Sequence, residues 1–331
     1  MNSFGVVFKV SLFGESHGNS IGVVIDGCPP GINIGPDDFM ADLSRRQSGG
    51  KGTTNRRETD RPEILSGVYN GSTTGSPITM ITRNSDKISS DYDDFKSVPR
   101  PGHADYVSGI KYSGFADLRG SGHFSGRITW GLVAAGVIAK LIVRPAEINA
   151  KLISAGGMTD IDQALEKAMA EGDSIGGIVE CSIVHPQKAL GEPFFYSVES
   201  ALSHIVFSIP AIKGIEFGSG FSAASMKGST HNDPLIDSTG RTSTNNAGGI
   251  NGGISNGNEI LFRAAVKPTS STGVAQRTYD FSKGQMAELG IKGRHDTCIA
   301  LRMPVIIEAA AAIAMADLLM IDMGINGSRK F

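Results

Sequence analysis

Cysteine is scarce in this chain and is not arranged for a disulfide framework or a metal site. The three cysteines among 331 residues, Cys28, Cys181 and Cys298, are far apart, odd in number and without the paired spacing of zinc ligands. The first residues also lack a long apolar core followed by a small-residue cleavage pattern. We therefore expect no metal site, no disulfide scaffold and, by default, a cytoplasmic location.

An excess of charge of one sign is missing as well. The chain has 31 Lys and Arg residues against 33 Asp and Glu residues, which gives a formal net charge of -2. Duplex binding usually needs many phosphate contacts spread over one face of a protein. A nucleic-acid partner is therefore not expected.

Long apolar runs are few, and they are interrupted. The two most apolar stretches are 130–143 and 304–323, and the second contains Glu308 and Asp317. Charged residues inside such a run favour helices buried in a protein core over membrane spans. The 40% apolar content is sufficient for a substantial core, so no membrane contact is expected.

Against this even background, positive charge is concentrated in one Gly/Ser/Thr-rich stretch. Six cationic residues occur within 17 positions: Arg45, Arg46, Lys51, Arg56, Arg57 and Arg61. Residues 47–62 show no hydrophobic period, which indicates a mobile loop. A solvated basic loop is one interpretation, and a site for an anionic ligand is the other.

Hydrophobic periodicity predicts alternating strands and helices along the chain. Strands are expected at 8–13, 21–26, 63–68, 77–83, 177–185, 214–225 and 260–266. Helices are expected from 36 through Arg46, at 197–206, and in the two apolar stretches. Two halves, each with strands, a buried helix and a long polar loop, suggest a duplicated α+β design within one domain spanning 1–331.

Three polar clusters could carry acid–base chemistry. Residues 14–18 place Ser16 and His17 between glycines at the end of a predicted strand, 100–105 contain His103, and 294–296 contain Arg294 and Asp296. Taken singly, each has an ordinary interpretation: a hydrogen-bonded turn, a solvated loop histidine and an ion pair. Taken jointly with the arginines and several glycine-rich loops, they describe a pocket for a polyanionic small substrate and a phosphorylated cofactor.

Several of these motifs together resemble chorismate synthase. The resemblance covers 14–18 through 26–29, 100–106, 246–255, 267–271 and 293–296, in the same order and spacing. It implies a β-α-β sandwich with helices between two antiparallel sheets, assembled as a homotetramer. It also implies removal of phosphate from 5-enolpyruvylshikimate 3-phosphate by an anti-1,4-elimination in the shikimate pathway, using reduced FMN without net redox change.

Roles follow from the resemblance position by position. His17 resembles the acid that protonates the departing phosphate, His103 the histidine beside the reduced flavin, and Asp296 the carboxylate that helps remove the C6 proton. The implied substrate ligands are Ser16, Arg46, Arg100, Arg127 and Arg294. The implied flavin contacts are His123, Phe124, Ser125, Pro210, Ala211, Gly252, Lys267, Pro268, Thr269, Ser270, Ser271 and Arg294.

The chain departs from the family pattern at two places. Residues 123–127 read His-Phe-Ser-Gly-Arg where Arg-Ser-Ser-Ala-Arg is common, and Lys51 or Gly52 stands where an arginine associated with nicotinamide binding is common. Arg46 and Lys51 are the candidate NADP contacts, and we expect a monofunctional enzyme that receives reduced FMN from elsewhere, for instance from a separate flavin reductase. A catalytically idle relative that binds flavin or anionic metabolites and a flavin oxidoreductase are the alternatives.

Overall fold

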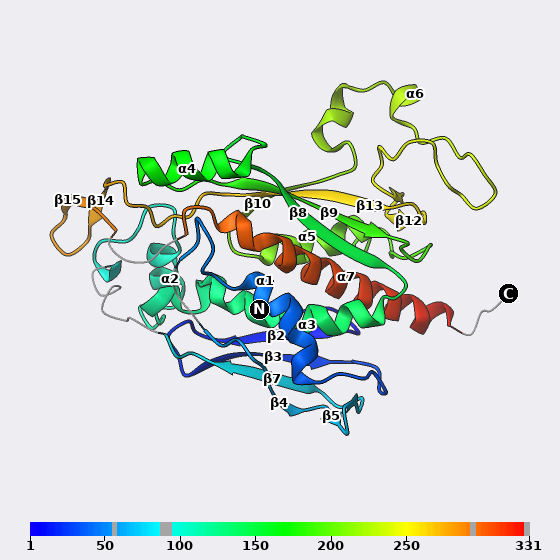
Figure 1. The fold of residues 1–331 in the computed structure, drawn as a ribbon, viewed down its shortest axis with the longest axis horizontal. Coiled ribbons are helices and arrows are strands. Elements are labelled where there is room, and N and C mark those ends of the chain that lie inside the picture. The colour runs from blue at the N-terminus through cyan, green and yellow to red at the C-terminus, as the bar shows by residue number, and fades with distance from the viewer. Residues whose placement is uncertain (55–57, 87–94, 292–295, 328–331) are drawn as a thin grey trace.

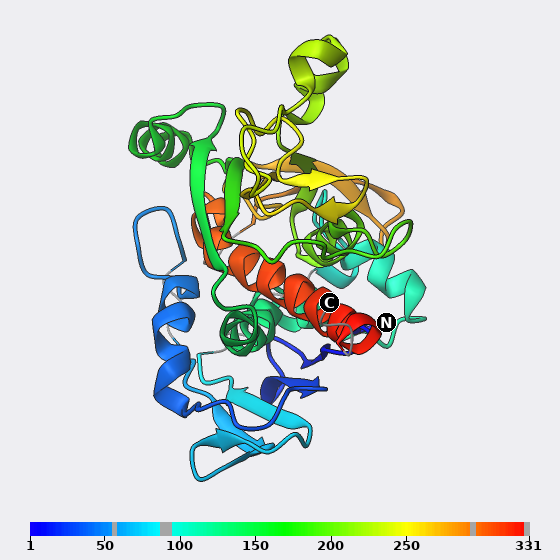
Figure 2. The same ribbon diagram turned by 90° about the vertical axis from the view of Figure 1, so that its right-hand side faces the viewer.

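Two antiparallel sheets enclose a layer of helices in this computed structural model (Figure 1). The structure describes residues 1–54, 58–86, 95–291 and 296–327. Figure 2, turned by 90°, shows the long C-terminal helix lying between the two sheets. The expected α+β class, with helices between two antiparallel sheets, is confirmed.

The first sheet has five strands in the order β1-β2-β3-β7-β4. Its strands are β1 (Ser3–Phe4), β2 (Lys9–Gly14), β3 (Ser20–Asp26), β4 (Glu63–Ser66) and β7 (Ile78–Arg83), and all neighbours pair antiparallel. Alternate residues of β3, Ile21, Val23 and Ile25, are buried, because successive side chains of a strand point to opposite faces. A small hairpin of β5 (Val68–Tyr69) and β6 (Ser72–Thr73) joins β4 to β7.

The second sheet has four strands in the order β10-β13-β9-β8. They are β8 (Glu147–Ala155), β9 (Gly177–Val184), β10 (Ile212–Phe217) and β13 (Ile260–Val266), again antiparallel throughout. Each half of the chain thus supplies one sheet and one long buried helix, as the duplicated design suggested. The two sheets differ in strand number and strand order.

The layer between the sheets is built on α3 (Thr129–Ile142) and α7 (Met303–Asn326), which pack along each other. Small residues permit the close approach: a Cβ added at Gly136 would lie 2.3 Å from the Cβ of Ala309. The helices α1 (Met40–Arg46) and α5 (Val198–Ser208) complete the layer. Within the described part of the chain, one helical segment, 299–326, is long and apolar enough to cross a membrane, and 78% of its most apolar window is buried inside the protein.

The two buried acidic residues of α7 are satisfied by distant partners. Glu308 pairs with Arg45 at 2.6 Å and with Lys140 at 2.9 Å. Asp317 accepts hydrogen bonds of 2.7–3.0 Å from the backbone N–H groups of residues 6–8. Because a buried carboxylate is costly unless it is paired, these contacts explain how charge is tolerated in the apolar run.

The other elements are short or peripheral. They are η1 (Pro36–Phe39), α2 (Asp105–Lys111), η3 (Arg119–Phe124), η4 (Gly126–Ile128), α4 (Ile161–Glu171), η5 (Gly220–Ser225), α6 (Gly228–His231), β11 (Ile250–Asn251), β12 (Ile254–Ser255), β14 (Gln276–Asp280), β15 (Gln285–Leu289) and η6 (Ile299–Arg302). The prediction of a strand over 214–225 was wrong in its second half, which is the short helix η5. The described residues of 47–62 contain no helix or strand, as expected.

Candidate functional site

One large cavity of about 1060 Å³ lies where loops from both halves of the chain meet. Among the described residues, six cationic and four carboxylate side chains line it, so this part of its wall carries net positive charge. Most of the residues that the sequence singled out line this cavity: His17, Arg46, Arg100, His103, His123, Phe124, Ser125, Arg127, Pro210, Ala211, Lys267, Pro268, Thr269, Ser270, Ser271 and Asp296. The combination of titratable side chains and fixed cations suits acid–base chemistry on an anion.

His17 stands on the turn that follows β2, and its side chain is almost fully buried. The side-chain amide of Asn84 donates hydrogen bonds of 3.0 Å to the carbonyls of Glu15 and Gly18, and these two bonds fix the turn. Gly120 covers the imidazole so closely that an added Cβ would lie 2.2 Å from its Cδ2. These contacts leave the imidazole little freedom of orientation.

Arg46 and Arg127 reach the cavity from α1 and η4 and share one buried carboxylate. Asp60 Oδ2 accepts from Arg46 Nη2, and Asp60 Oδ1 accepts from Arg127 Nη1. Arg127 Nε also donates to Asn84 Oδ1 at 3.1 Å. Burial alone would raise the pKa of Asp60, but the charges of Arg46 and Arg127 outweigh it and hold that pKa below its usual value.

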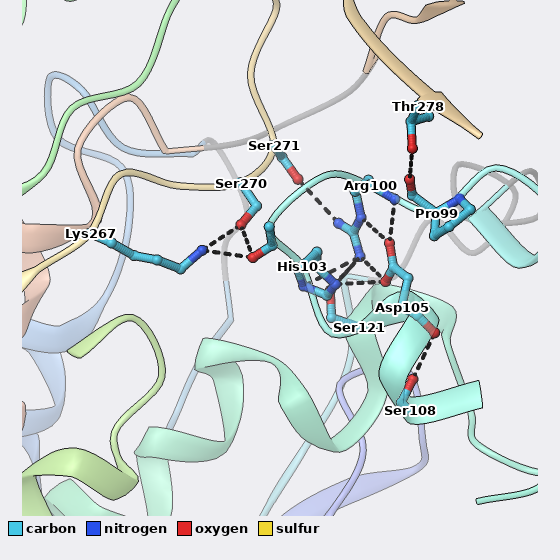
Figure 3. A network of polar contacts seen from close by, with 11 residues as sticks. Pro99, Arg100, His103, Asp105, Ser108, Ser121, Lys267, Ser270, Ser271 and Thr278 are labelled. Carbon is cyan, nitrogen blue, oxygen red and sulfur yellow. Dashed lines mark hydrogen bonds and ion pairs between the residues drawn. The ribbon is translucent and has the colours of Figure 1, made fainter. Parts of the chain in front are cut away.

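On another wall, Arg100 and His103 are held by a second buried carboxylate, Asp105 (Figure 3). Asp105 accepts from Arg100 Nε and Nη2, both at 2.8 Å, and lies 2.6 Å from His103 Nδ1. Burial would raise the pKa of Asp105, but the hydrogen bonds from Arg100 and His103 outweigh it and hold the pKa well below its usual range. The negative charge on Asp105 favours the tautomer of His103 with its proton on Nδ1.

The loop after β13 closes the cavity beside this group. Lys267 Nζ donates to the Gly102 carbonyl at 2.8 Å and to Ser270 Oγ at 2.7 Å, and Ser271 Oγ accepts from Arg100 Nη1 at 3.1 Å (Figure 3). Partial burial and the nearby charge of Lys213 lower the pKa of Lys267. The buried Thr269 Oγ1 has no hydrogen-bond partner among the described residues. These hydroxyl and ammonium groups form a donor set suited to a phosphate group.

Asp296 enters the cavity from the segment before η6. Its Oδ1 accepts from the backbone N–H of Thr54 at 2.8 Å, and its Oδ2 lies 3.8 Å from Arg302 Nη1. The residue is 7% exposed. A carboxylate held by one backbone donor and one distant guanidinium keeps acceptor capacity, as a general base requires.

Three of the predicted contacts that the structure describes do not line the cavity. Ser16 is fully buried, Gly252 lies in the turn between β11 and β12, and Lys51 pairs with Glu166 at 2.8 Å on the surface. Arg294 lies outside the described residues, as do Arg56 and Arg57. Of the other loop cations, Arg61 pairs with the exposed Asp37. The cationic cluster therefore contributes one described residue, Arg46, to the cavity wall.

Sequence patterns did not mark several residues that line or support the cavity, among them Asp60, Asn84, Lys213 and Arg302. Asp60 and Asn84 sit in segments of mixed polar composition, and their importance comes from arginine partners 14 to 67 positions away in the chain. No local pattern marks them. Among the described residues, no group of three or more His, Cys, Asp or Glu side chains is arranged to hold a metal ion.

Comparison with known proteins places the whole chain in one family. The family model described as chorismate synthase matches residues 8–320. The chain is 56% identical over 327 residues to a chorismate synthase of Chitinophaga pinensis, covering 98% of both chains, and 44% identical over 353 residues to one of Archaeoglobus fulgidus, covering 97% of this chain and 98% of the relative. A crystal structure of chorismate synthase superimposes with a TM-score of 0.75 at 26% identity, covering 97% of this chain and 94% of that one. The chain therefore belongs to the chorismate synthase family of carbon–oxygen lyases.

Proposed function

We propose that this protein eliminates phosphate from 5-enolpyruvylshikimate 3-phosphate to give chorismate, with reduced FMN as cofactor and no net redox change. The observation that carries the proposal is the convergence of His17, His103 and Asp296 with arginine side chains on one cavity. A protein that merely binds an anion has no need of three acid–base groups. The substrate has two carboxylates and a phosphate, which guanidinium groups suit.

The residues present fit a flavin phosphate and its ring. The hydroxyl of Thr269, which has no partner among the described residues, would hold the phosphate together with Lys267, Ser270 and Ser271 on the same cavity wall. The apolar parts of Phe124, Pro210 and Ala211 offer surfaces for a flat ring system, and Ser125 and His123 lie beside them on the cavity wall. When bound, reduced FMN supplies the electron-rich ring that assists loss of the unactivated C6 hydrogen.

His17 would donate a proton to the departing phosphate as the bond from its bridging oxygen to C3 breaks. Because Gly120 and the turn held by Asn84 restrict the imidazole, the proton is delivered from one fixed position. Arg46 and Arg127 would stabilise the negative charge that develops on the leaving group. Ser16, which is fully buried and does not line the cavity, would act through the turn and not through a contact on the cavity wall.

At the other end of the reaction, Asp296 would accept the C6 proton. Its backbone donor, Thr54, holds the carboxylate in place while its second oxygen keeps acceptor capacity. His103 keeps Nδ1–H directed at Asp105, so it would donate a proton to the cofactor from Nε2 in its imidazolium form, in which both nitrogens carry a proton. Loss of phosphate and of one proton leaves one new carbon–carbon double bond, so the balance needs no oxidant.

Reduced flavin would come from a separate reductase. Lys51, the candidate NADP contact, is engaged by Glu166 on the surface, which weakens the case for nicotinamide binding through this residue. Arg46, the other candidate, is paired with Asp60 in the cavity wall. We further propose that the protein works as a homotetramer in the cytoplasm. Large exposed apolar side chains, including Phe194, Phe195 and Phe221, are consistent with such self-association.

An anaerobic assay tests the proposed function. The purified protein is mixed with dithionite-reduced FMN and the substrate, and phosphate and chorismate are measured against the amount of flavin. Elimination predicts many turnovers per reduced flavin, whereas a flavin oxidoreductase consumes reductant stoichiometrically. An idle binding protein would bind both ligands and release no phosphate, and that result would sink the proposal.

A further inference from the structure

Asp60 is a carboxylate buried in the wall of a cavity that is otherwise built to attract anions. The residue is fully buried, and its two oxygens accept from Arg46 on one side and Arg127 on the other. An acidic group at this place lowers the positive potential available to an anionic ligand. Asp60 should therefore aid ligand binding in another way, and that gain should outweigh the loss of positive potential.

The two guanidinium groups could not be held together without such a group. Arg46 and Arg127 are 4% and 5% exposed, so both charges are largely removed from water. Burial lowers the pKa of Arg127, the charge of Arg46 lowers it further, and Asp60 opposes both. With Asp60 between them, two like charges become an Arg–Asp–Arg unit with one net positive charge.

The position of Asp60 is itself fixed by the core. Its backbone carbonyl accepts from Trp130 Nε1 at 2.8 Å, and Trp130 is fully buried at the start of α3. Its φ of 53° lies in the left-handed region, which Asp and Asn tolerate better than most residues. The carboxylate therefore projects from a backbone that has little freedom to move.

The unit contains a donor without a partner. Both arginines line the cavity, and Arg127 Nη2 is buried without a hydrogen-bond partner among the residues that the structure describes. Since Nε and Nη1 of Arg127 are occupied by Asn84 and Asp60, the ring of contacts fixes where Nη2 points. An oxyanion is the ligand class that completes such a donor set.

We propose that Asp60 is a positioning residue that holds Arg46 and Arg127 side by side in the cavity wall, so that the two guanidinium groups meet one oxyanion group of the substrate as a unit. The identity of that substrate rests on the proposed function. The positioning itself requires only a ligand bearing a phosphate or a carboxylate.

Positioning and simple electrostatics predict opposite signs for Asp60→Asn. The amide is close in size, is tolerated at positive φ, and removes one negative charge, so a cavity governed by potential alone would bind anions more tightly. In the positioning account the amide nitrogen faces a guanidinium donor, the pair separates, and binding weakens by roughly tenfold or more. Asp37→Asn is the matched control, because it removes the carboxylate from an exposed Arg–Asp pair with Arg61.

Binding is measured by titration calorimetry on the full protein, without turnover, using two probes: 5-enolpyruvylshikimate 3-phosphate and inorganic phosphate. We expect Asp60→Asn to weaken both, with Asp37→Asn unchanged. Unchanged or tighter binding by Asp60→Asn would overturn the proposal. Binding to the wild type tests the proposed function separately. If the wild type binds inorganic phosphate but not 5-enolpyruvylshikimate 3-phosphate, that function is refuted. The ratio of phosphate affinities between Asp60→Asn and the wild type still decides the role of Asp60.

A second variant covers the case in which Asp60→Asn does not fold. Trp130→Phe keeps most of the buried apolar volume and removes the hydrogen bond to the Asp60 carbonyl. It leaves every charge in the cavity wall in place. We expect affinity for both probes to fall severalfold, and an affinity equal to that of the wild type would contradict the positioning role.

Discussion

Replacing Gly120 with alanine should disable His17 without removing it. Gly120 has φ 59° and ψ 24°, and its backbone lies against the imidazole. An added Cβ would lie 2.2 Å from Cδ2 and 2.5 Å from Nε2 of His17, and 2.9 Å from Ser16 Oγ. Since carbon atoms in contact are normally about 3.5–4.0 Å apart, the imidazole must move by more than about 1 Å.

The size of the effect follows from that displacement. A misplacement of about 1 Å at a reacting group can cost on the order of 10²-fold in rate. Complete loss of a general acid costs roughly 10²–10⁴-fold. We therefore expect kcat of Gly120→Ala to fall about 10²-fold or more, approaching the value of His17→Ala. Alanine in the left-handed region also lowers the free energy of unfolding by about 1–2 kcal/mol.

Gly172→Ala separates the two contributions. Gly172 ends α4 with φ 66° and ψ 21°, nearly the same backbone conformation as Gly120, and an added Cβ would meet nothing within 4 Å. The control should therefore lose about 1–2 kcal/mol of stability and keep its turnover. Both variants are compared by urea unfolding and by chorismate formation with chemically reduced FMN.

Two outcomes would refute this reasoning. Turnover by Gly120→Ala at the wild-type rate would show that the position of His17 is not held by this contact, or that His17 does not carry the chemistry. An equal loss of turnover in Gly172→Ala would show that the effect comes from general destabilisation.

Three further predictions concern buried polar side chains that support the site or the core. Asn84→Ala should cost about 1–3 kcal/mol of stability and lower kcat, because one amide fixes both the His17 turn and Arg127. Urea unfolding measures the first effect and turnover the second, and normal turnover would contradict the role of Asn84 in positioning these two residues. Asp105 has a lower pKa in the folded protein than in the unfolded one, so its stabilisation is complete above about pH 4 and is lost as pH falls below that value. The difference in unfolding free energy between wild type and Asp105→Asn should therefore be constant near neutral pH and shrink in acid, and a difference that grows in acid would reverse the assigned sign. Asp317→Asn should speed hydrogen exchange at the backbone amides of residues 6–8 and cost about 1–3 kcal/mol, while unchanged exchange by mass spectrometry would contradict the anchoring role.

Periodicity predicted the elements whose burial is one-sided and regular. The strand at 260–266 is found as β13 with alternate residues buried, and the two apolar stretches are the core helices α3 and α7. These elements obey a local rule, because the sequence period matches the geometry that buries them. The helix α2 was missed because it opens a polar loop and leaves Tyr106, Val107 and Ile110 exposed, so its pattern has no buried face to reveal it.

The candidate site was predictable where it rests on contiguous motifs. His17, His103 and Asp296 stand in short segments with distinctive composition, and all three line the cavity. Asp60 and Arg302 were not found, because neither lies in a distinctive motif. Asp60 matters through contacts 14 and 67 positions away in the chain, and such pairings are set by the packing of the sheets.

The sequence likewise does not show which of the six neighbouring cations lines the cavity. Arg45 and Arg46 are adjacent in sequence, but α1 directs Arg45 to Glu308 and Arg46 to the cavity. Neighbouring residues on a helix point about 100° apart, so the direction of each depends on how α1 is seated. Composition could indicate an anionic ligand, and only the packed helix shows which arginine faces it.

The hydrogen bond from Thr54 to Asp296 joins the first half of the chain to the second half at the cavity wall. Neither half contains a complete set of acid, base and cationic groups, since His17 and Arg46 come from one and Lys267 and Asp296 from the other. During synthesis, a ligand spanning these groups can therefore find its whole site only after the last core helix has been added. Ligand binding therefore stabilises the complete folded protein by mass action, and it does not stabilise a partial chain to the same extent. Because only the complete fold contains the whole site, turnover reports complete folding.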